Sequence, residues 1–149
     1  MSNEKRIKDF RLAHTMIRVQ NLELSLNFYC DILGMQILRK TDYPEGRFTN
    51  TFIGYGPEIE FPTLELTYNW DSEELGSGRN FGHLAYQVDN IYETCERLQE
   101  QGVTINRPPR DGYMAFVRSP DGVSVELLQS KKALVPQEPW KSMENTGQW

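Results

Sequence analysis

The sequence predicts an α+β fold in which one βαβββ module is used twice in tandem. The first observation is an internal repeat, because stretches of the first half reappear in the same order in the second half. The second observation is that strand and helix signals fall at equivalent places in both copies. The matching stretches are 14–22 with 83–91, 34–37 with 102–105, and 65–66 with 126–127.

Each module is expected to open with a strand that carries a histidine. Side chains alternate between two faces along the stretch 12–19, so His14 and Arg18 share a face that Ile17 does not. The second histidine, His83, opens the equivalent strand of the other module. The two histidines of the chain are therefore expected at matching positions.

An amphipathic helix is expected after each of these strands. In the first module, apolar residues recur at helical spacing over about residues 22–33, with Asn21 in the N-cap position and Gly34 just after the end. The second helix is expected over about residues 91–101, with Asn90 as its N-cap.

Three short strands are then expected to complete each module, separated by glycine and proline residues. The last two strands of the second module are joined by a turn at 119–122, which has proline second and glycine fourth. The expected strands are 35–40, 50–54 and 63–68 in the first module, and 104–107, 113–118 and 123–129 in the second.

These elements divide the chain into one domain and a tail. Residues 1–130 form the domain, with modules at about 12–70 and 81–130, and a chain of 149 residues can bury an apolar core without disulfides. The stretch 131–149 has no periodicity, so we expect an extended or disordered C-terminal tail.

The composition is that of a soluble globular protein and argues against nucleic acid or membrane as partners. The net charge of −5 is spread along the chain, which has no cluster of basic residues and no apolar run of membrane-spanning length. Cys30 and Cys95 lack the spacing of a metal or redox motif, so we expect reduced, structural thiols. The N-terminal stretch has no apolar signal segment, and a cytoplasmic location is expected.

Each module also carries a glutamate on an otherwise apolar strand. Glu65 stands between Leu64 and Leu66 and should therefore point away from the apolar face. If the two modules pair about a pseudo-twofold axis, two imidazoles and two carboxylates converge, a set that suits a divalent first-row metal with open coordination positions. The candidate metal ligands are His14, Glu65, His83 and Glu126.

The alternative is that both histidines are ordinary surface or core residues, which is the usual situation for an isolated histidine. The repeat favours the metal, because each histidine has an equivalent glutamate in the same module. A charged group at a half-buried strand position without a partner is costly, and a metal ion would supply that partner.

The sequence resembles the glyoxalase I family of the vicinal oxygen chelate superfamily over about residues 12–130. The Ser-Pro-Asp-Gly turn at 119–122 is typical of the superfamily, and the Leu-Glu-Leu-Thr-Tyr-Asn-Trp stretch at 64–70 narrows the resemblance to glyoxalase I. The other stretches that carry the resemblance are 14–19, 25–29, 33–35, 54–57, 81–83, 115–117 and 125–127.

The resemblance implies a homodimer of glyoxalase fold with the metal site at the subunit interface. His14 and Glu65 would come from one chain, and His83 and Glu126 from the other. The histidine as first ligand, and the lack of a long insertion before the Glu65 strand, resemble the short bacterial class that works with Ni²⁺ or Co²⁺; Zn²⁺ is the alternative. Ser124 departs from the family pattern, because many members have a large aromatic residue there.

The implied activity is a carbon–sulfur lyase reaction in methylglyoxal detoxification. The substrate is the hemithioacetal of methylglyoxal and glutathione, and proton transfer through an enediolate gives S-lactoylglutathione. A metal would stabilise the charge that develops on two neighbouring oxygens. We expect Glu126 to be the base and Glu65 to serve the opposite face or the other epimer. Alternatively, both glutamates are ligands only and a metal-bound hydroxide moves the proton.

Glutathione has two carboxylates, so basic and amide groups are expected around the site. The candidate glutathione-binding residues are Arg18, Thr67, Asn69, Arg79, Arg107 and Arg110. Any of these arginines could instead be a solvated surface charge, and the resemblance does not choose between Arg107 and Arg110. Met114 and Phe116 are candidates for an apolar pocket around the substrate's methyl group or for the core, and Phe52 is expected in the core.

Other classes of protein fit parts of this pattern. Methylmalonyl-CoA epimerases share the modules but usually have glutamine at the position of Glu65, and ring-cleaving dioxygenases use two histidines and one glutamate on iron in longer chains. Non-catalytic binding proteins of the superfamily sequester small molecules and lack the ligand set. A trypanothione-type thiol is an alternative to glutathione.

Overall fold

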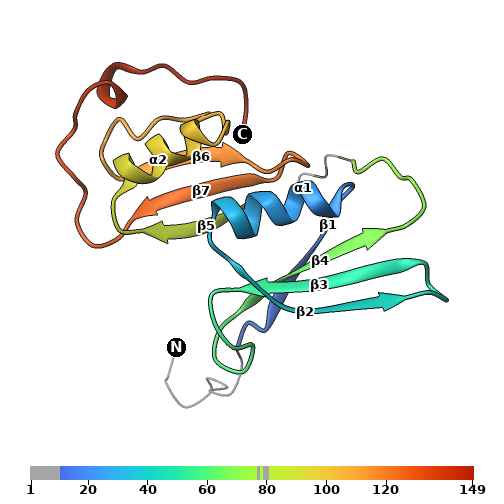
Figure 1. The fold of residues 1–149 in the computed structure, drawn as a ribbon. Helices are drawn as coiled ribbons and strands as arrows, with labels where there is room; N and C mark the ends of the chain where they lie inside the picture. Colours follow the sequence, from blue (N-terminus) through green and yellow to red (C-terminus); the bar gives the residue numbers. More distant parts are fainter. Residues whose placement is uncertain (1–10, 77, 79–80) are drawn as a thin grey trace, which may run out of the picture.

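The computed structural model describes residues 11–76, 78 and 81–149, which form two β-sheets with helices packed on them (Figure 1). The first module contains β1 (His14–Arg18), α1 (Leu22–Leu26), the π-helix η2 (Asn27–Ile32), β2 (Gln36–Tyr43), β3 (Phe48–Gly54) and β4 (Thr63–Asn69). The second contains β5 (His83–Val88), α2 (Ile91–Glu100), β6 (Met114–Arg118) and β7 (Ser124–Gln129), and the tail contains the 3₁₀-helix η3 (Trp140–Ser142).

The two sheets have the same core topology, which confirms the predicted α+β class and the repeat. The first sheet has the order β1-β4-β3-β2 and the second has the order β5-β7-β6. In each sheet the histidine strand (β1 or β5) pairs in parallel with the glutamate strand (β4 or β7). The strand just before the glutamate strand in the sequence (β3 or β6) pairs with it in antiparallel fashion. Equivalent residues of the two modules therefore occupy equivalent positions.

The strand predicted at 104–107 is wrong, because this segment forms only an isolated bridge between Arg107 and Phe116. The Arg107 amide donates to the Phe116 carbonyl at 3.2 Å, and the Phe116 amide donates in return at 3.0 Å. Pro108 and Pro109 follow directly. Since proline has no amide hydrogen, the ladder cannot continue past this point.

The predicted helices are confirmed, and so are their caps. The Asn21 side chain accepts from the Leu24 amide at 3.0 Å, and the Asn90 side chain accepts from the Tyr92 and Glu93 amides. The first helix continues from α1 into η2, so that it ends close to the predicted residue 33. These caps satisfy amides that have no partner inside the helix.

The helices and one face of each sheet share a single apolar core. Ile53 and Leu66 from the first module and Ile91 and Val125 from the second are fully buried in one cluster. Ser25 of α1 also donates to Asp121 of the second module at 3.2 Å. The modules are therefore packed against each other within the chain.

The C-terminal tail runs along the outside of the second module (Figure 1). It has little regular structure beyond η3, but Trp140 is buried and the Leu134 amide donates to the Gly112 carbonyl at 2.9 Å. Gly112 has a φ of +69°, and a Cβ there would lie 2.0 Å from the Leu134 carbonyl oxygen. Only glycine fits this close approach.

The second face of each sheet is more open than its core face. Along β1 and β5, residues of the open face are exposed, and they alternate with residues that are more buried. The open faces carry the two histidines and the two candidate glutamates.

No helix among the described residues is long and apolar enough to cross a bilayer.

Candidate active site

The first half-site, His14 and Glu65, is formed by the parallel pairing of β1 with β4. His14 lies opposite Thr63 and Met16 lies opposite Glu65, so the histidine and the glutamate are diagonal neighbours on one face. The Nε2 atom of His14 lies 3.1 Å from Oε2 of Glu65. The imidazole is 44% exposed and the carboxylate 14%, so the pair opens toward solvent on its histidine side.

The second half-site, His83 and Glu126, repeats this arrangement on β5 and β7. His83 lies opposite Ser124 and Ala85 lies opposite Glu126, which is the register of the first half-site. The Nε2 atom of His83 lies 2.8 Å from Oε2 of Glu126, with exposures of 43% and 14%. The repeat thus produces two His–Glu pairs of nearly equal geometry.

A phenylalanine packs against the histidine in both half-sites. The Phe52 ring meets His14 edge-on with centroids 5.5 Å apart, and the Phe116 ring meets His83 in the same way at 5.4 Å. These phenylalanines lie directly opposite the glutamates in the strand register. Such contacts fix the planes of the imidazoles and leave Nε2 toward the carboxylate. Phe52 is buried, but it packs against His14 and Arg39 on the open face and not in the apolar core cluster where it was expected.

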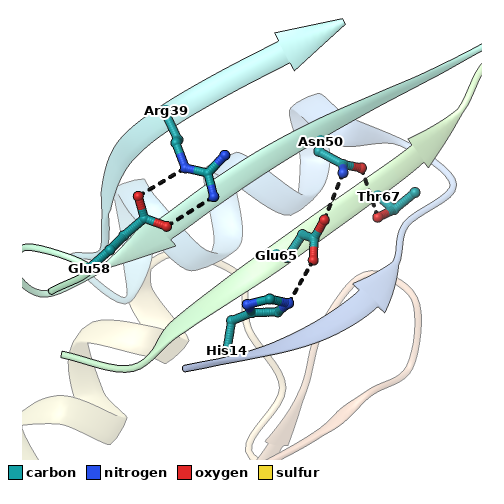
Figure 2. Close-up of polar contacts among 6 residues, drawn as sticks. All are labelled: His14, Arg39, Asn50, Glu58, Glu65 and Thr67. Carbon is teal, nitrogen blue, oxygen red and sulfur yellow. Dashed lines mark hydrogen bonds and ion pairs between the residues drawn. The ribbon is translucent and has the colours of Figure 1, made fainter. Parts of the chain in front are cut away.

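Glu65 has a second polar partner that the sequence did not indicate. Figure 2 shows that the Asn50 side chain reaches across from β3 and donates to Oε1 of Glu65 at 2.7 Å. The Thr67 hydroxyl donates to Oδ1 of the Asn50 side chain at 3.0 Å. Both oxygens of the carboxylate are therefore engaged.

An ion pair flanks the first half-site at the β2 edge. Arg39 donates to the Glu58 carboxylate through two nitrogens, at 2.9 and 3.2 Å (Figure 2). The guanidinium also lies 3.6 Å from the centroid of the Phe52 ring. Hydrogen bonding within this pair raises the pKa of Arg39 and lowers the pKa of Glu58. Strand alternation alone did not reveal this contact, since Glu58 lies in a loop.

The four candidate ligands of the chain lie in two separate His–Glu pairs. Among the residues that the structure describes, no three histidine, cysteine, aspartate or glutamate side chains gather into a possible metal site. The donor chemistry fits a divalent cation, because each pair offers one imidazole nitrogen and one carboxylate on an accessible face. A set of four ligands requires two such pairs to face each other.

The candidate glutathione-binding residues of the first module lie near the first half-site. Arg18 is exposed on the same face of β1 as His14. The Asn69 side chain donates to Glu73 at 2.7 Å, and Thr67 is nearly buried in its bond to Asn50. Arg79 lies outside the described residues. Of these candidates, Arg18 has the side chain most accessible to a bound thiol, because it is exposed.

Two other candidates, Arg107 and Arg110, bond within the protein. Arg107 donates to the Met114 carbonyl at 2.7 Å and lies 3.6 Å from Asp111. Arg110 donates to the Met143 carbonyl at 3.0 Å and also bonds a tail asparagine. Part of the hydrogen-bonding capacity of each guanidinium is thus already used.

The candidate pocket residues of β6 lie beside the second half-site. Met114 and Phe116 are half-buried and alternate with the buried Ala115. They face the same side as Glu126, because Phe116 pairs with it across the strands. Their side chains form an apolar surface next to the carboxylate.

Comparison with known proteins agrees with this architecture. Residues 11–127 match the family model described as Glyoxalase/Bleomycin resistance protein/Dioxygenase superfamily. A lactoylglutathione lyase from Neisseria meningitidis serogroup A is 52% identical over 81% of this chain and 91% of its own. One from Salmonella typhimurium is 44% identical, over 83% of this chain and 95% of its own.

Solved structures give the same result. The trypanothione-dependent glyoxalase I of Leishmania major superposes with a TM-score of 0.78 at 42% identity, covering 81% of this chain and 87% of that one. An antibiotic-binding protein from Streptomyces, at 20% identity and a TM-score of 0.61, shares the fold alone. The repeated module, the paired His–Glu half-sites and these relatives lead to one conclusion: the chain belongs to the Glyoxalase/Bleomycin resistance protein/Dioxygenase superfamily.

Proposed function

We propose that the chain is a lactoylglutathione lyase, which converts the hemithioacetal of methylglyoxal and glutathione into S-lactoylglutathione. The observation that carries the proposal is the matched pair of half-sites, with His–Glu distances of 3.1 and 2.8 Å. The support from relatives is the 52% identity to a lactoylglutathione lyase over most of both chains.

Two chains would complete the site. In a homodimer, the first half-site of one chain faces the second half-site of the other, so that His14 and Glu65 meet His83 and Glu126 of its partner. Supporting this arrangement, the histidines are exposed on open sheet faces and no cluster of three possible ligands forms among the described residues of one chain. A twofold axis would generate two equal sites per dimer.

The four side chains would hold a divalent metal, with Ni²⁺ expected, Co²⁺ possible and Zn²⁺ as the alternative. Two neutral imidazoles and two carboxylates suit all three ions and balance the charge. When bound, the metal supplies a Lewis acid that stabilises negative charge on the two adjacent oxygens of the substrate.

The chain's own residues move the proton. Glu126 takes the proton from the carbon that carries sulfur and hydroxyl and returns it to the neighbouring carbon. The hydroxyl proton of the first carbon passes to the ketone oxygen, so the first carbon becomes the thioester carbonyl, the ketone becomes the hydroxyl, and the reaction is an isomerisation with no change in overall oxidation state. Glu65 serves the opposite face of the substrate or the other epimer. Met114 and Phe116 exclude water around the methyl group.

The thiol part of the substrate extends over the rim of the site. Arg18 supplies a positive charge on the open face of β1. The further candidates are Thr67 and Asn69 on β4, Arg107 and Arg110 in the loop before β6, and Arg79, which lies outside the described residues. A cytoplasmic location would supply the reduced thiol.

Trypanothione is the second candidate thiol. The observation that favours it is the 42% identity to a glyoxalase I that depends on trypanothione. Comparing turnover with the methylglyoxal adducts of glutathione and trypanothione decides between the two.

The test is the formation of thioester from methylglyoxal and glutathione by protein that has been stripped of metal and reloaded. Activity with Ni²⁺ or Co²⁺ is expected, and activity with none of Ni²⁺, Co²⁺ or Zn²⁺ would contradict the proposal. Equilibrium dialysis provides the control, because a non-catalytic binding protein would retain no metal after loading.

A further inference from the structure

The two half-sites differ in what surrounds their glutamates. In the first, Asn50 donates to Oε1 of Glu65 at 2.7 Å while His14 lies 3.1 Å from Oε2 (Figure 2). Thr67 in turn donates to Oδ1 of Asn50, which fixes the side-chain amide so that its NH₂ group faces the Glu65 carboxylate. Glu65 is therefore clamped at both of its oxygens.

The equivalent places beside Glu126 are apolar. Strand register puts Met114 opposite Leu128, where the first module has Asn50 opposite Thr67. Neither methionine nor leucine can donate a hydrogen bond to a carboxylate. Within the described part of the chain, the polar side-chain contact of Glu126 is with the histidine of its own half-site.

We propose that Asn50 is a positioning residue that gives the two glutamates different tasks, an inference that rests on the proposed function. The clamp holds Glu65 in one rotamer, since partners behind a ligand orient it and raise its affinity; Glu65 then acts mainly as a ligand and only secondarily as a base for the opposite face or the other epimer. Glu126 has no such clamp, so its carboxylate can turn from the ligating position toward the substrate and act as the base. The repeat gives the two glutamates equivalent positions in their sheets, and Asn50 gives Glu65 a hydrogen-bond donor that Glu126 lacks.

The first test removes the clamp. Asn50→Leu keeps the size of the side chain and removes the donor, and Ni²⁺ binding is measured by calorimetry on metal-free protein without substrate. The expected result is a Ni²⁺ affinity about 10-fold weaker than that of the wild type. Asn27→Leu is the matched control, because Asn27 is exposed on η2, bonds Asp31 and should bind Ni²⁺ as the wild type does.

The second test installs a clamp on the other glutamate. Met114→Asn combined with Leu128→Thr recreates the Asn50–Thr67 pair beside Glu126. The expected result is a fall in kcat of about 10-fold or more, because the base is now held away from the substrate, with Ni²⁺ affinity equal to or tighter than that of the wild type.

Two results would overturn the inference: wild-type Ni²⁺ affinity in Asn50→Leu, or full kcat in the folded double variant. Circular dichroism shows whether the double variant folds, and if it does not, Asn50→Leu alone decides. An inactive wild-type protein would refute the proposed function separately, because the Ni²⁺ titration needs no turnover.

A different observation concerns the tail, which brings an aromatic side chain to the second half-site. The Trp149 ring stacks on the Phe116 ring with centroids 6.0 Å apart, and the Phe116 ring also contacts the His83 ring edge-on. Arg118 donates to the Gln148 carbonyl at 3.3 Å and holds the last residues against β6.

A hollow of about 810 Å³ lies between the tail and the beginning of β5 and β7. Its lining includes Trp149, Phe81 and Ser124. Ser124 precedes Glu126 by two residues on β7, shares its face and lies opposite His83 in the register with β5. The hollow therefore adjoins the second half-site.

We infer that Trp149 forms a wall of the site against the thiol part of the substrate, an inference that also rests on the proposed function. A rigid aromatic face offers packing area to the chain of a peptide thiol at little cost in conformational entropy. The predicted result is that Trp149→Ala raises KM by about 3- to 10-fold with a smaller effect on kcat, while Trp149→Phe restores most of the loss. Lys141→Ala, an exposed tail change, is the control.

Direct contact is measured by ¹⁹F NMR of protein labelled with 5-fluorotryptophan and titrated with S-methylglutathione. The Trp149 resonance, assigned by its loss in Trp149→Phe, should shift more than those of Trp70 and Trp140. An unshifted resonance, or a fall in kcat with unchanged KM, would overturn the inference. Binding without turnover in the wild type would refute the proposed function and leave this contact intact.

Discussion

Replacing Glu126 by glutamine is the substitution that bears most directly on the mechanism. Glutamine keeps the shape of the side chain and one oxygen near His83, but it cannot accept a proton from carbon. Around Glu126, Phe116, Met114 and Leu128 cannot act as bases, and His83, 2.8 Å away, would be occupied as a metal ligand. No nearby side chain can therefore take over the proton transfer.

The expected loss is then the whole contribution of a general base. Such a base contributes about 100- to 10,000-fold to the rate, which corresponds to about 3–5 kcal/mol of transition-state stabilisation. The assay is thioester formation at saturating Ni²⁺, with the metal content of each variant measured in parallel. Glu65→Gln is the matched control, and it should lower metal affinity more than it lowers kcat, because Glu65 is held as a ligand by Asn50.

The reasoning is refuted if the Glu126→Gln variant carries a full complement of metal and retains near-wild-type kcat. That result would remove Glu126 as the base and favour a metal-bound hydroxide. Equal losses of kcat in both glutamine variants would contradict the unequal surroundings of the two glutamates.

Three further predictions concern the scaffold. Gln129→Ala should lower the free energy of unfolding by about 1.5–4.5 kcal/mol in a urea titration, because buried Gln129 makes three hydrogen bonds around the start of α2. Gln87→Ala, at an exposed position, should change the free energy of unfolding little, and equal effects of the two substitutions would contradict the reasoning. Burial raises the pKa of the Cys95 thiol to about 12, so the buried neutral thiol stabilises the fold fully below the ordinary thiol pKa, and this stabilisation is lost as the pH rises toward 12. At pH 8 a thiol reagent should therefore label Cys95 only after denaturation. Gly112→Ala should release the tail from its contact at Leu134, detected as faster proteolysis of the tail with the domain intact; an unchanged cleavage rate would refute the close approach.

The sequence was sufficient for the features that depend on local pattern. The helix caps at Asn21 and Asn90 have the predicted geometry, because capping involves only residues within one turn. The repeat predicted equal surroundings for the two histidines, and their registers against β4 and β7 are the same. Alternation along each strand placed the glutamates on the open faces.

Features that depend on pairing between distant strands were beyond the sequence. Asn50 bonds Glu65 only because β3 and β4 pair in one register, and a shift of one residue would turn Asn50 to the opposite face. The internal bonds of Arg107 and Arg110 depend on the loop before β6 and on the tail, which have no periodic signal. The predicted strand at 104–107 failed because two prolines end its ladder.

The sharing of one site between two chains is the central claim, and mixing two inactive variants tests it directly. One variant carries His14→Ala and Glu65→Ala, and the other carries His83→Ala and Glu126→Ala. Each should be inactive alone, because each disables both sites of a twofold dimer. After they are unfolded together and refolded with Ni²⁺, random pairing makes half of the dimers mixed, with one intact site each, so about a quarter of wild-type activity should return. If no activity returns although mixed dimers form, the two half-sites do not meet across the dimer and the account is contradicted.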